Sequence, residues 1–368
     1  MTLRIGVDGH VLTGKFQGTR TTLSNLLRAV ASRLGDRQLV VYADDPEKAR
    51  ALLGTNAFAY RDLGRVPAIR RLLSVLPQQF RDDGIDLGVF QYMAPLRGRH
   101  IVFVHDLLPL THPHLFPLKI RLRTRIFFSL AIRRAAMVLA VSDYTRGEIM
   151  RRFRLPSGKL RVVRNGPSFP PATYRQSSPG PKGRYIMTVG RIEPRKNIAL
   201  LVDAFRKAGV PGVRLVIVGA FDPDFPQVRI EGERVEVRSG VSDDELIELY
   251  RGASLFVYPS EAEGFGMPLL DAILFGLPVI SSDRTSLPEV GGDLAAYFDP
   301  TAAGAVDHLA AKIAGHFGDA PLSPPTPAQR EAHAARFNWS RAAGDFLDAI
   351  DAAQQYLSAP AGKAGVIR

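Results

Sequence analysis

The stretch LFVYPSEAEGFGMPLLDAILFGLPVIS, residues 255–281, joins two short apolar runs through a glycine-bearing loop and a longer apolar segment. Leu255–Tyr258 is continuous rather than alternating, which is typical of a strand covered on both faces. Pro268 fits the first turn of a helix, where its missing N–H costs nothing. Gly276 and Pro278 then end that helix before the next apolar run. The stretch therefore predicts a strand, loop, helix and strand of an α/β protein.

Similar short apolar runs occur along the whole chain, with helix-length segments between them. This alternation favours βαβ winding and parallel sheets. The predicted strands are Leu3–Asp8, Leu39–Ala43, Ile101–His105, Met137–Val141, Tyr185–Val189, Val213–Val218, Leu255–Tyr258 and Pro278–Ser281. Four lie in each half, so the sequence predicts two wound α/β units.

The length of 368 residues also favours two domains. The long stretch dense in Pro, Gly and Ser, Asn165–Pro171 followed by Gln176–Gly183, is interpreted as the linker. We therefore predict an N-terminal domain over residues 1–172 and a C-terminal domain over 173–339. A final helix, 340–368, is expected to return to the first domain.

Composition narrows the class of protein. The chain is 46% hydrophobic and has no cysteine, which excludes a disulfide scaffold, a thiolate nucleophile and an iron–sulfur centre. No secretory signal is apparent at the N-terminus, and apolar stretches such as 272–282 are too short to span a membrane. We therefore expect a cytoplasmic protein.

Charge differs strongly between the halves. Residues 1–180 hold 29 basic and 12 acidic residues, a balance of +17, whereas residues 181–368 hold 19 and 24, a balance of −5. A basic domain attracts phosphorylated molecules, anionic lipid or nucleic acid. The segment Lys119–Arg134 carries six of the cations among large apolar residues. It is either a basic amphipathic helix for a membrane surface or an ordinary helix with a solvated face.

The loop after Leu255–Tyr258 is the first candidate site. Gly264, Phe265 and Gly266 lead into the predicted helix, whose N-terminus offers backbone N–H groups to an anion. Glu263 lies on this loop and Asp271 lies about two helical turns later. Carboxylates in such places suit the hydroxyl groups of a sugar or a ribose.

A second loop follows Tyr185–Val189. Arg191 and Lys196 leave the end of this strand, the edge at which wound α/β sheets bind ligands. Two cations there would neutralise a diphosphate. We expect Arg195 to be a solvated loop charge and Asn197 to cap the following helix.

These two loops resemble those of the retaining nucleotide-sugar glycosyltransferases of family four. The resemblance implies the GT-B architecture, two Rossmann-like doubly wound domains facing a central cleft. It implies that Arg191 and Lys196, together with Gly264–Gly266, bind the donor diphosphate. It further implies that Glu263 contacts the donor sugar and that Asp271 binds the ribose. The family usually has Glu in place of Asp271, which is one methylene shorter.

The first half carries weaker matches to this family. Ile101–Val104 is a predicted buried strand that leads to His105, and the resemblance implies that this histidine contacts the donor sugar. A structural histidine at a strand end is the alternative. The loop after the first strand contains Gly14, Gly18 and Thr19, where relatives often have a second glycine beside the helix. The resemblance places this loop near the donor phosphate and the acceptor.

The expected function is therefore that of a metal-independent hexosyltransferase without cofactor. It would move a sugar, for which we favour mannose from a GDP donor, to a glycan or lipid-linked acceptor in bacterial surface polysaccharide or lipopolysaccharide assembly. The nearest acidic pair, Asp222–Pro–Asp224, is interpreted as a polar turn. The expected partners are the donor, the acceptor and the anionic inner face of the cytoplasmic membrane. Nucleic acid is not expected as a partner. The alternatives are an inactive donor-binding member and a non-catalytic basic protein that binds polyanions.

Overall fold

The computed structural model describes residues 2–14, 18–156, 158–175, 183–223, 225, 230 and 232–358. Contacts divide the chain into two compact units. The first comprises residues 1–111, 118–166 and 337–368, and the second comprises 112–117 and 167–336. The chain thus enters the second unit at residue 167, shortly before the predicted boundary. Residues 176–182 of the predicted linker lie outside the described residues.

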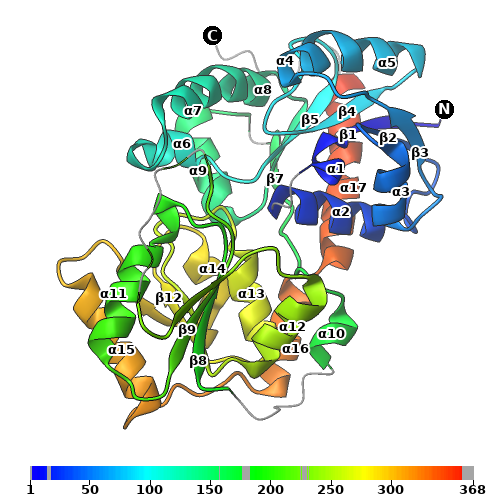
Figure 1. Ribbon diagram of the computed structural model, residues 1–368. Helices are drawn as coiled ribbons and strands as arrows, with labels where there is room; N and C mark the ends of the chain where they lie inside the picture. Colours follow the sequence, from blue (N-terminus) through cyan, green and yellow to red (C-terminus); the bar gives the residue numbers. More distant parts are fainter. Residues whose placement is uncertain are drawn as a thin grey trace. The chain divides into compact units, whose positions relative to one another are not determined.

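The first unit is built on a parallel sheet of seven strands (Figure 1). Across the sheet the strands are β3 (Ala59–Asp62), β2 (Gln38–Ala43), β1 (Arg4–Asp8), β4 (Leu87–Gln91), β5 (His100–Val104), β6 (Met137–Ala140) and β7 (Leu160–Val162). The central strands β1, β5 and β6 are almost wholly buried, as their continuous apolar runs predict, and so is β4, which the sequence analysis did not predict.

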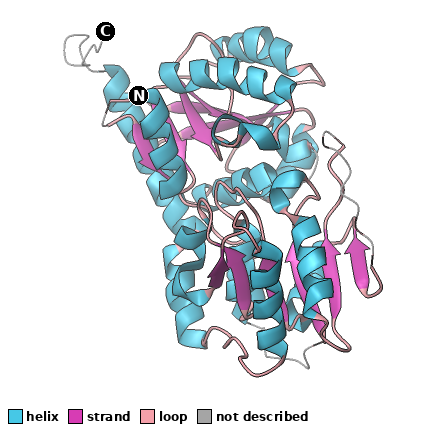
Figure 2. Ribbon diagram, turned by 90° about the vertical axis from the view of Figure 1, so that its left-hand side faces the viewer, coloured by secondary structure: helices cyan, strands magenta, loops and turns pink. Residues whose placement is uncertain are grey.

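Helices cover both faces of this sheet (Figure 2). They are α1 (His10–Thr13), α2 (Gly18–Val30), α3 (Pro46–Leu53), α4 (Ala68–Arg70), η1 (Arg71–Val75), α5 (Leu76–Asp82), α6 (Leu108–Thr111), α7 (Leu118–Arg123), η3 (Thr124–Phe128), α8 (Ser129–Arg134), α9 (Asp143–Phe153) and α17 (Trp339–Ser358). Ser142 caps α9, because its hydroxyl oxygen accepts the backbone amide of Thr145 at 3.1 Å.

The last helix, α17, belongs to the first unit, where it packs against α2 and β6. Phe346 on α17 lies 5.8 Å from Phe103 of β5, measured between ring centroids. Arg37, just before β2, donates to both carboxylate oxygens of Asp351 at 2.6 Å. The predicted return of the C-terminal helix to the first domain is the arrangement that the structure shows.

The second unit contains a parallel sheet of six strands. Their order is β10 (Val235–Arg238), β9 (Arg214–Val218), β8 (Tyr185–Val189), β11 (Leu255–Tyr258), β12 (Val279–Ser282) and β13 (Ala296–Phe298). This order, 3-2-1-4-5-6 within the unit, is that of a Rossmann domain, and the first sheet begins with the same order. The predicted α/β fold of two Rossmann-like domains is confirmed.

The helical segments of the second unit are η2 (Pro113–Leu115), α10 (Pro171–Arg175), η4 (Pro194–Lys196), α11 (Ile198–Ala208), α12 (Asp243–Gly252), α13 (Met267–Leu274), α14 (Leu287–Gly291), η5 (Gly292–Leu294), α15 (Ala305–Phe317) and α16 (Pro327–Arg336). One core packs α11 and α15 on the sheet through side chains such as Leu201, Phe205, Leu309 and Ile313. Among the described residues of the chain, no helix is both long and apolar enough to cross a membrane.

Strand order marks one position in each sheet where a ligand is expected. In a Rossmann sheet the crevice lies where the order reverses, outside the carboxyl ends of the first and fourth strands. In the second unit those strands are β8 and β11, and in the first unit they are β1 and β4. Both loops singled out from the sequence follow β8 and β11.

Candidate functional site

The loops after β8 and β11 meet through a buried ion pair. Lys196 Nζ lies 2.5 Å from Glu263 Oε1, and both side chains are less than a tenth exposed. The same ammonium donates to the Tyr258 hydroxyl at 2.7 Å and lies 4.8 Å from the centre of its ring. The structure therefore brings together the predicted cation and the predicted acid at the point where the strand order reverses.

Glu263 is held from several sides. Its Oε1 also accepts the hydroxyls of Ser260 at 2.5 Å and Tyr258 at 3.1 Å, and its Oε2 lies 2.9 Å from the Arg195 guanidinium. Burial alone would raise the pKa of this carboxyl, but Arg195 and Lys196 outweigh it and lower the pKa to about 2. Glu263 is therefore a carboxylate at every physiological pH.

Arg195 is not a solvated loop charge, so that expectation is wrong. Its side chain is 20% exposed and pairs with Glu193 at 2.6 Å as well as with Glu263. It also donates to the backbone oxygen of Ala262 at 3.0 Å. The short turn η4 places Arg195 and Lys196 on either side of one carboxylate, an arrangement that sequence spacing does not reveal.

Lys196 retains capacity for a ligand despite its burial. Burial lowers the pKa of this ammonium, and the negative charge of Glu263 opposes that shift. An ammonium has three N–H donors, and the bonds to Tyr258 and Glu263 use two of them. One N–H is left for an anionic oxygen.

Arg191 lies on the same edge with a different partner. It follows Gly190, whose φ of +150° favours glycine, and it pairs with Asp222. Its side chain is 40% exposed, the most open among these cations. Asp222 is buried and opens a turn, in which the Phe225 amide donates to the Asp222 backbone oxygen at 3.2 Å, and Asp224 lies outside the described residues.

The loop Gly264–Phe265–Gly266 turns the chain into α13. Gly266 has a φ of +101°, and a Cβ there would meet Leu287 at 2.7 Å, so this position requires glycine. The Ser286 hydroxyl donates to the backbone oxygens of Glu263 and Phe265, both at 3.0 Å. The loop is thus fixed beside the first turn of α13, where backbone N–H groups favour anions.

Asp271 has partners unlike those of Glu263. Its Oδ1 accepts the Tyr174 hydroxyl at 2.7 Å and the Ser168 amide at 2.9 Å, and the residue is 2% exposed. Burial raises the pKa of this carboxyl to about 6, against the opposing effect of the two donors. Both donors belong to the segment by which the chain enters the second unit. The role of Asp271 toward a ribose stays a prediction.

His105 follows β5 in the first unit and is buried there. Its Nε2 lies 2.5 Å from Gln91 Oε1, and its ring stacks on Phe103 with centroids 5.9 Å apart. Burial lowers the pKa of the imidazole to about 4, so it is neutral at physiological pH. A bond donated from Nε2 to the Gln91 carbonyl leaves Nδ1 as a hydrogen-bond acceptor.

Comparison with known proteins identifies the family. Residues 16–167 match the family described as Glycosyltransferase Family 4, and residues 172–316 match the family described as Glycosyl transferases group 1. O-antigen chain mannosyltransferase B of Escherichia coli is 30% identical over 289 residues, which cover 73% of this chain and 74% of that protein. The chain is a family-four glycosyltransferase.

Other relatives and solved structures agree with this assignment. The glycosyltransferase is 31% identical to the O-antigen chain mannosyltransferase RfbU of Salmonella typhimurium over 57% of its own length and 59% of the relative. Sucrose-phosphate synthase of Thermosynechococcus elongatus aligns over 97% of this chain and 100% of that chain, with a TM-score of 0.72 and 18% identity. WaaG, a glycosyltransferase involved in lipopolysaccharide biosynthesis, aligns over 97% and 100%, with a TM-score of 0.63 and 16% identity. The predicted GT-B architecture is confirmed by these folds.

The loop after β1 is described only in part in this glycosyltransferase. Gly14 follows the short helix α1, and Gly18 and Thr19 open α2. Residues 15–17 between them lie outside the described residues. The role of Gly14, Gly18 and Thr19 toward donor or acceptor stays a prediction.

The sequence analysis did not identify several residues as part of the site. Tyr258, Ser260 and Arg195 surround the carboxylate of Glu263, and Gln91 fixes the ring of His105. Asn197 precedes α11 as predicted, yet its side chain makes no cap bond. It instead takes a left-handed conformation, φ +51°, that ends the turn η4, which Asn tolerates.

Proposed function

We propose that this glycosyltransferase moves a mannosyl unit from GDP-mannose to a hydroxyl of a surface polysaccharide or its lipid-linked precursor, with retention at the anomeric carbon. The Lys196–Glu263 pair, set where the strand order reverses, is the observation that carries the donor-binding part. The mannosyltransferase relatives support the sugar and the polysaccharide context. Retention rests on the family-four membership.

The donor diphosphate would be bound by side chains and backbone. Lys196 supplies its remaining N–H, Arg191 offers an exposed guanidinium, and the first turn of α13 supplies amide groups. These groups stabilise the charge that develops on the leaving diphosphate. Since cations already serve that purpose, we propose that the reaction needs no metal ion or other cofactor.

Proton transfer would involve the leaving phosphate and not Glu263. A carboxyl with a pKa of about 2 carries no proton to donate, so Glu263 orients Lys196 and Arg195 and accepts a sugar hydroxyl. In this scheme the leaving phosphate accepts the acceptor's proton on the same face of the sugar. His105, neutral through burial, is proposed to accept a sugar hydroxyl through Nδ1.

The donor assignment is tested by calorimetry and turnover. Lys196→Ala should weaken GDP binding by about 1.5–3 kcal/mol, the range for a hydrogen bond to a charged group, and should weaken guanosine binding less. Lys312→Ala, an exposed change on α15, is the matched control. Equal losses for GDP, GMP and guanosine would contradict the assignment, as would faster transfer from UDP-glucose than from GDP-mannose in the wild type.

Metal independence has its own test. Transfer should persist in excess EDTA with the wild-type rate, because Arg191 and Lys196 meet the diphosphate charge. A complete loss that magnesium or manganese alone restores would overturn this part of the proposal and leave the donor assignment standing.

The acceptor context includes an anionic membrane, for which the first unit has a suited surface. The ridge Leu118, Leu122 and Ile126 on α7 and η3 is between half and two-thirds exposed. Exposed cations flank it, namely Lys119, Arg121, Arg123 and Arg125. Each such cation contributes about 1 kcal/mol near an anionic surface. We propose that this face docks on the inner leaflet.

Vesicle co-sedimentation tests the membrane surface. Wild type should bind anionic vesicles at low salt and leave them at high salt, because screening shortens the reach of the charges. Reversing Arg121, Arg123 and Arg125 to Glu should reduce binding. Reversing Arg81, Arg97 and Arg99, exposed elsewhere on the first unit, is the matched control for net charge. Equal binding to neutral vesicles, or equal effects of both triple variants, would refute this surface.

A further inference from the structure

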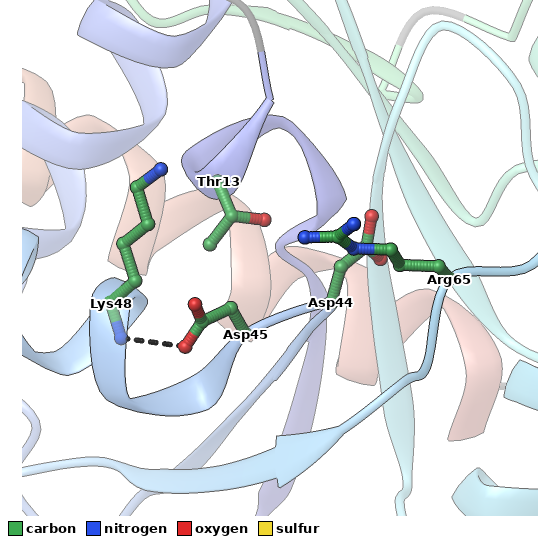
Figure 3. Close-up of a pocket in the computed structure, with 5 residues that line it drawn as sticks. All are labelled: Thr13, Asp44, Asp45, Lys48 and Arg65. Carbon is green, nitrogen blue, oxygen red and sulfur yellow. Dashed lines mark hydrogen bonds between the residues drawn. The ribbon is translucent and has the colours of Figure 1, made fainter.

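The first unit holds a small polar pocket that lies outside the donor site. It is lined by Thr13, Asp44, Asp45, Lys48 and Arg65 (Figure 3). Asp44 and Asp45 follow β2, Arg65 follows β3, and Thr13 ends the helix that follows β1. The pocket therefore lies at the carboxyl edge of the sheet, where wound α/β proteins bind ligands.

One wall of the pocket has an unsatisfied hydrogen-bonding group. The Thr13 hydroxyl oxygen is buried and has no hydrogen-bond partner among the described residues. In Figure 3 this hydroxyl is directed toward the side of the pocket from which Arg65 extends. Buried polar atoms are normally paired, so an orphan on a pocket wall indicates a group that a ligand satisfies.

The charges of the pocket balance. Two carboxylates, Asp44 and Asp45, face two cations, Lys48 and Arg65. Partial burial raises the pKa of Asp44, while nearby His10, Arg71 and Arg65 act to lower it. The only bond between lining residues drawn in Figure 3 joins Asp45 to the backbone N–H of Lys48, at 3.0 Å. The side-chain ends of Lys48 and Arg65 thus remain available as donors.

This chemistry selects a neutral ligand with many hydroxyls. Carboxylates accept hydrogen bonds from hydroxyls but repel a phosphate or a sulfate. The cations donate to ring and hydroxyl oxygens, and Thr13 does either. The cavity volume of about 170 Å³ is below the roughly 300 Å³ at which pockets for drug-sized ligands begin, and so suits one ring.

We propose that this pocket is a subsite for one neutral sugar ring of the acceptor glycan. Thr13, Asp44 and Arg65 are then the residues that select the acceptor sugar. The inference rests on the proposed function, because a transferase that extends a glycan has to hold the acceptor sugar. The proposal assigns acceptor recognition to residues that follow β2 and β3. These residues lie outside the two loops that carry the resemblance to family four.

The test uses methyl α-mannoside as probe and the full-length protein. Saturation-transfer NMR should show binding to the wild type, and Thr13→Val and Asp44→Asn should each weaken it about tenfold or more, as for one lost hydrogen bond in a ligand site. Glu47→Gln, an equal loss of charge on the neighbouring helix α3 away from the pocket, should leave binding unchanged.

Three outcomes would overturn the subsite. They are absence of mannoside binding to the wild type, equal binding by the wild type and both pocket variants, and displacement of the mannoside by inorganic phosphate in preference to a second neutral sugar. GDP calorimetry on the same variants separates this from the proposed function. Unchanged GDP affinity with lost mannoside binding supports the subsite, whereas a wild type that binds mannoside but no nucleoside diphosphate refutes the donor assignment alone.

Discussion

The carboxyl edges of the two sheets are organised differently. In the second unit Glu263 is ringed by Lys196, Arg195, Ser260 and Tyr258, and its oxygens are occupied by these groups. In the first unit the buried polar atoms without a hydrogen-bond partner among the described residues include Thr13 Oγ1 and Gln91 Nε2, which follow or end strands and helices at the carboxyl edge. The Glu263 carboxylate is thus held by protein groups before any ligand binds, whereas these two atoms of the first unit are not bonded to any described residue.

The difference separates two ways of binding. A network that is already paired keeps its charges in place and needs no reorganisation when charge develops on a leaving group. An edge with unpaired groups gains its missing bonds only from a ligand, so it discriminates between ligands by the hydroxyls they present. We therefore assign preorganised electrostatics to the second unit and sugar selection to the first.

Glu263→Gln should have the largest effect on this contrast. It leaves Lys196 and Arg195 buried without their carboxylate, which costs about 3–5 kcal/mol of unfolding free energy. Since the folded pKa of about 2 lies below the usual glutamate value of 4.5, the ionised form stabilises the wild type above pH 4.5. That stabilisation is lost as pH falls toward 2. Urea unfolding across this range should show the loss in the wild type and a flatter profile in Glu263→Gln.

Glu261→Gln is the control for this variant. Glu261 pairs with His114, whose side chain is 63% exposed, so its loss should cost no more than about 1 kcal/mol. Equal destabilisation by the two glutamine variants would show that the network around Glu263 is not preorganised.

His105→Gln should change how stability depends on pH. Burial lowers the pKa of His105 from 6.5 to about 4, so the unfolded chain takes up the proton first. Wild-type stability should therefore fall as pH drops from about 6.5 to 4, by about 3 kcal/mol at 1.36 kcal/mol per pKa unit. The variant should lose less stability than wild type over this range, since His333, whose pKa burial also lowers to about 4, still contributes, and His114→Gln should behave as wild type. Identical pH profiles for His105→Gln and wild type would place this ring outside the buried environment.

Asp271→Asn should change the pH dependence of stability in the opposite sense, because the pKa of Asp271 is raised. The folded pKa of about 6 lies above the usual aspartate value of 3.8, so the protonated carboxyl stabilises the fold below pH 3.8. This contribution is lost as pH rises through 6. The neutral amide should remove that dependence, and at pH 7.5 the variant should be as stable as wild type or more so, by about 2 kcal/mol. Lower stability at pH 7.5 would contradict it, and guanosine calorimetry on the same variant tests the ribose contact.

The smallest effects compare one hydroxyl from each edge. Ser260→Ala removes a bond to the Glu263 carboxylate and should cost about 1.5–3 kcal/mol. Thr13→Val removes a hydroxyl that has no partner and should leave the unfolding free energy within about 0.5 kcal/mol of wild type, or raise it. Thermal unfolding of both variants measures the difference. A larger loss for Thr13→Val than for Ser260→Ala would reverse the contrast drawn between the edges.

Most of the buried strands were predictable, although the central strand β4 was missed, and the edge strands were not. Continuous runs such as Ile101–Val104 and Leu255–Tyr258 have apolar side chains on both faces, and all eight predicted strands are present. The strands β3 and β10, with sequences AYRD and VEVR, lie at sheet edges and mix charged with apolar residues. Their hydrogen bonds come from neighbouring strands, which no local pattern shows.

The site was predictable where backbone geometry imposes a residue type. Gly266 and Pro268 mark the turn into α13, and the position of Lys196 and Glu263 follows from the ends of adjacent strands. Arg195 was misread because its partner lies 68 residues away in the sequence, and charge alone does not distinguish a buried pair from a solvated side chain. The unpaired hydroxyl of Thr13 is a property of the folded surroundings only.

The return of the chain to the first unit governs the order in which the protein can be completed during synthesis. Arg33 and Arg37 bond to Ser340 and Asp351 across 307 and 314 residues of sequence. The helix α17, which carries these partners and buries Phe346 against β5, is the last described element to leave the ribosome. The second unit, mainly the contiguous segment 167–336, has by then been made in full. Synthesis halted before residue 337 would therefore leave the first unit with an open apolar face, exposed to chaperones and proteases, although the second unit had been made.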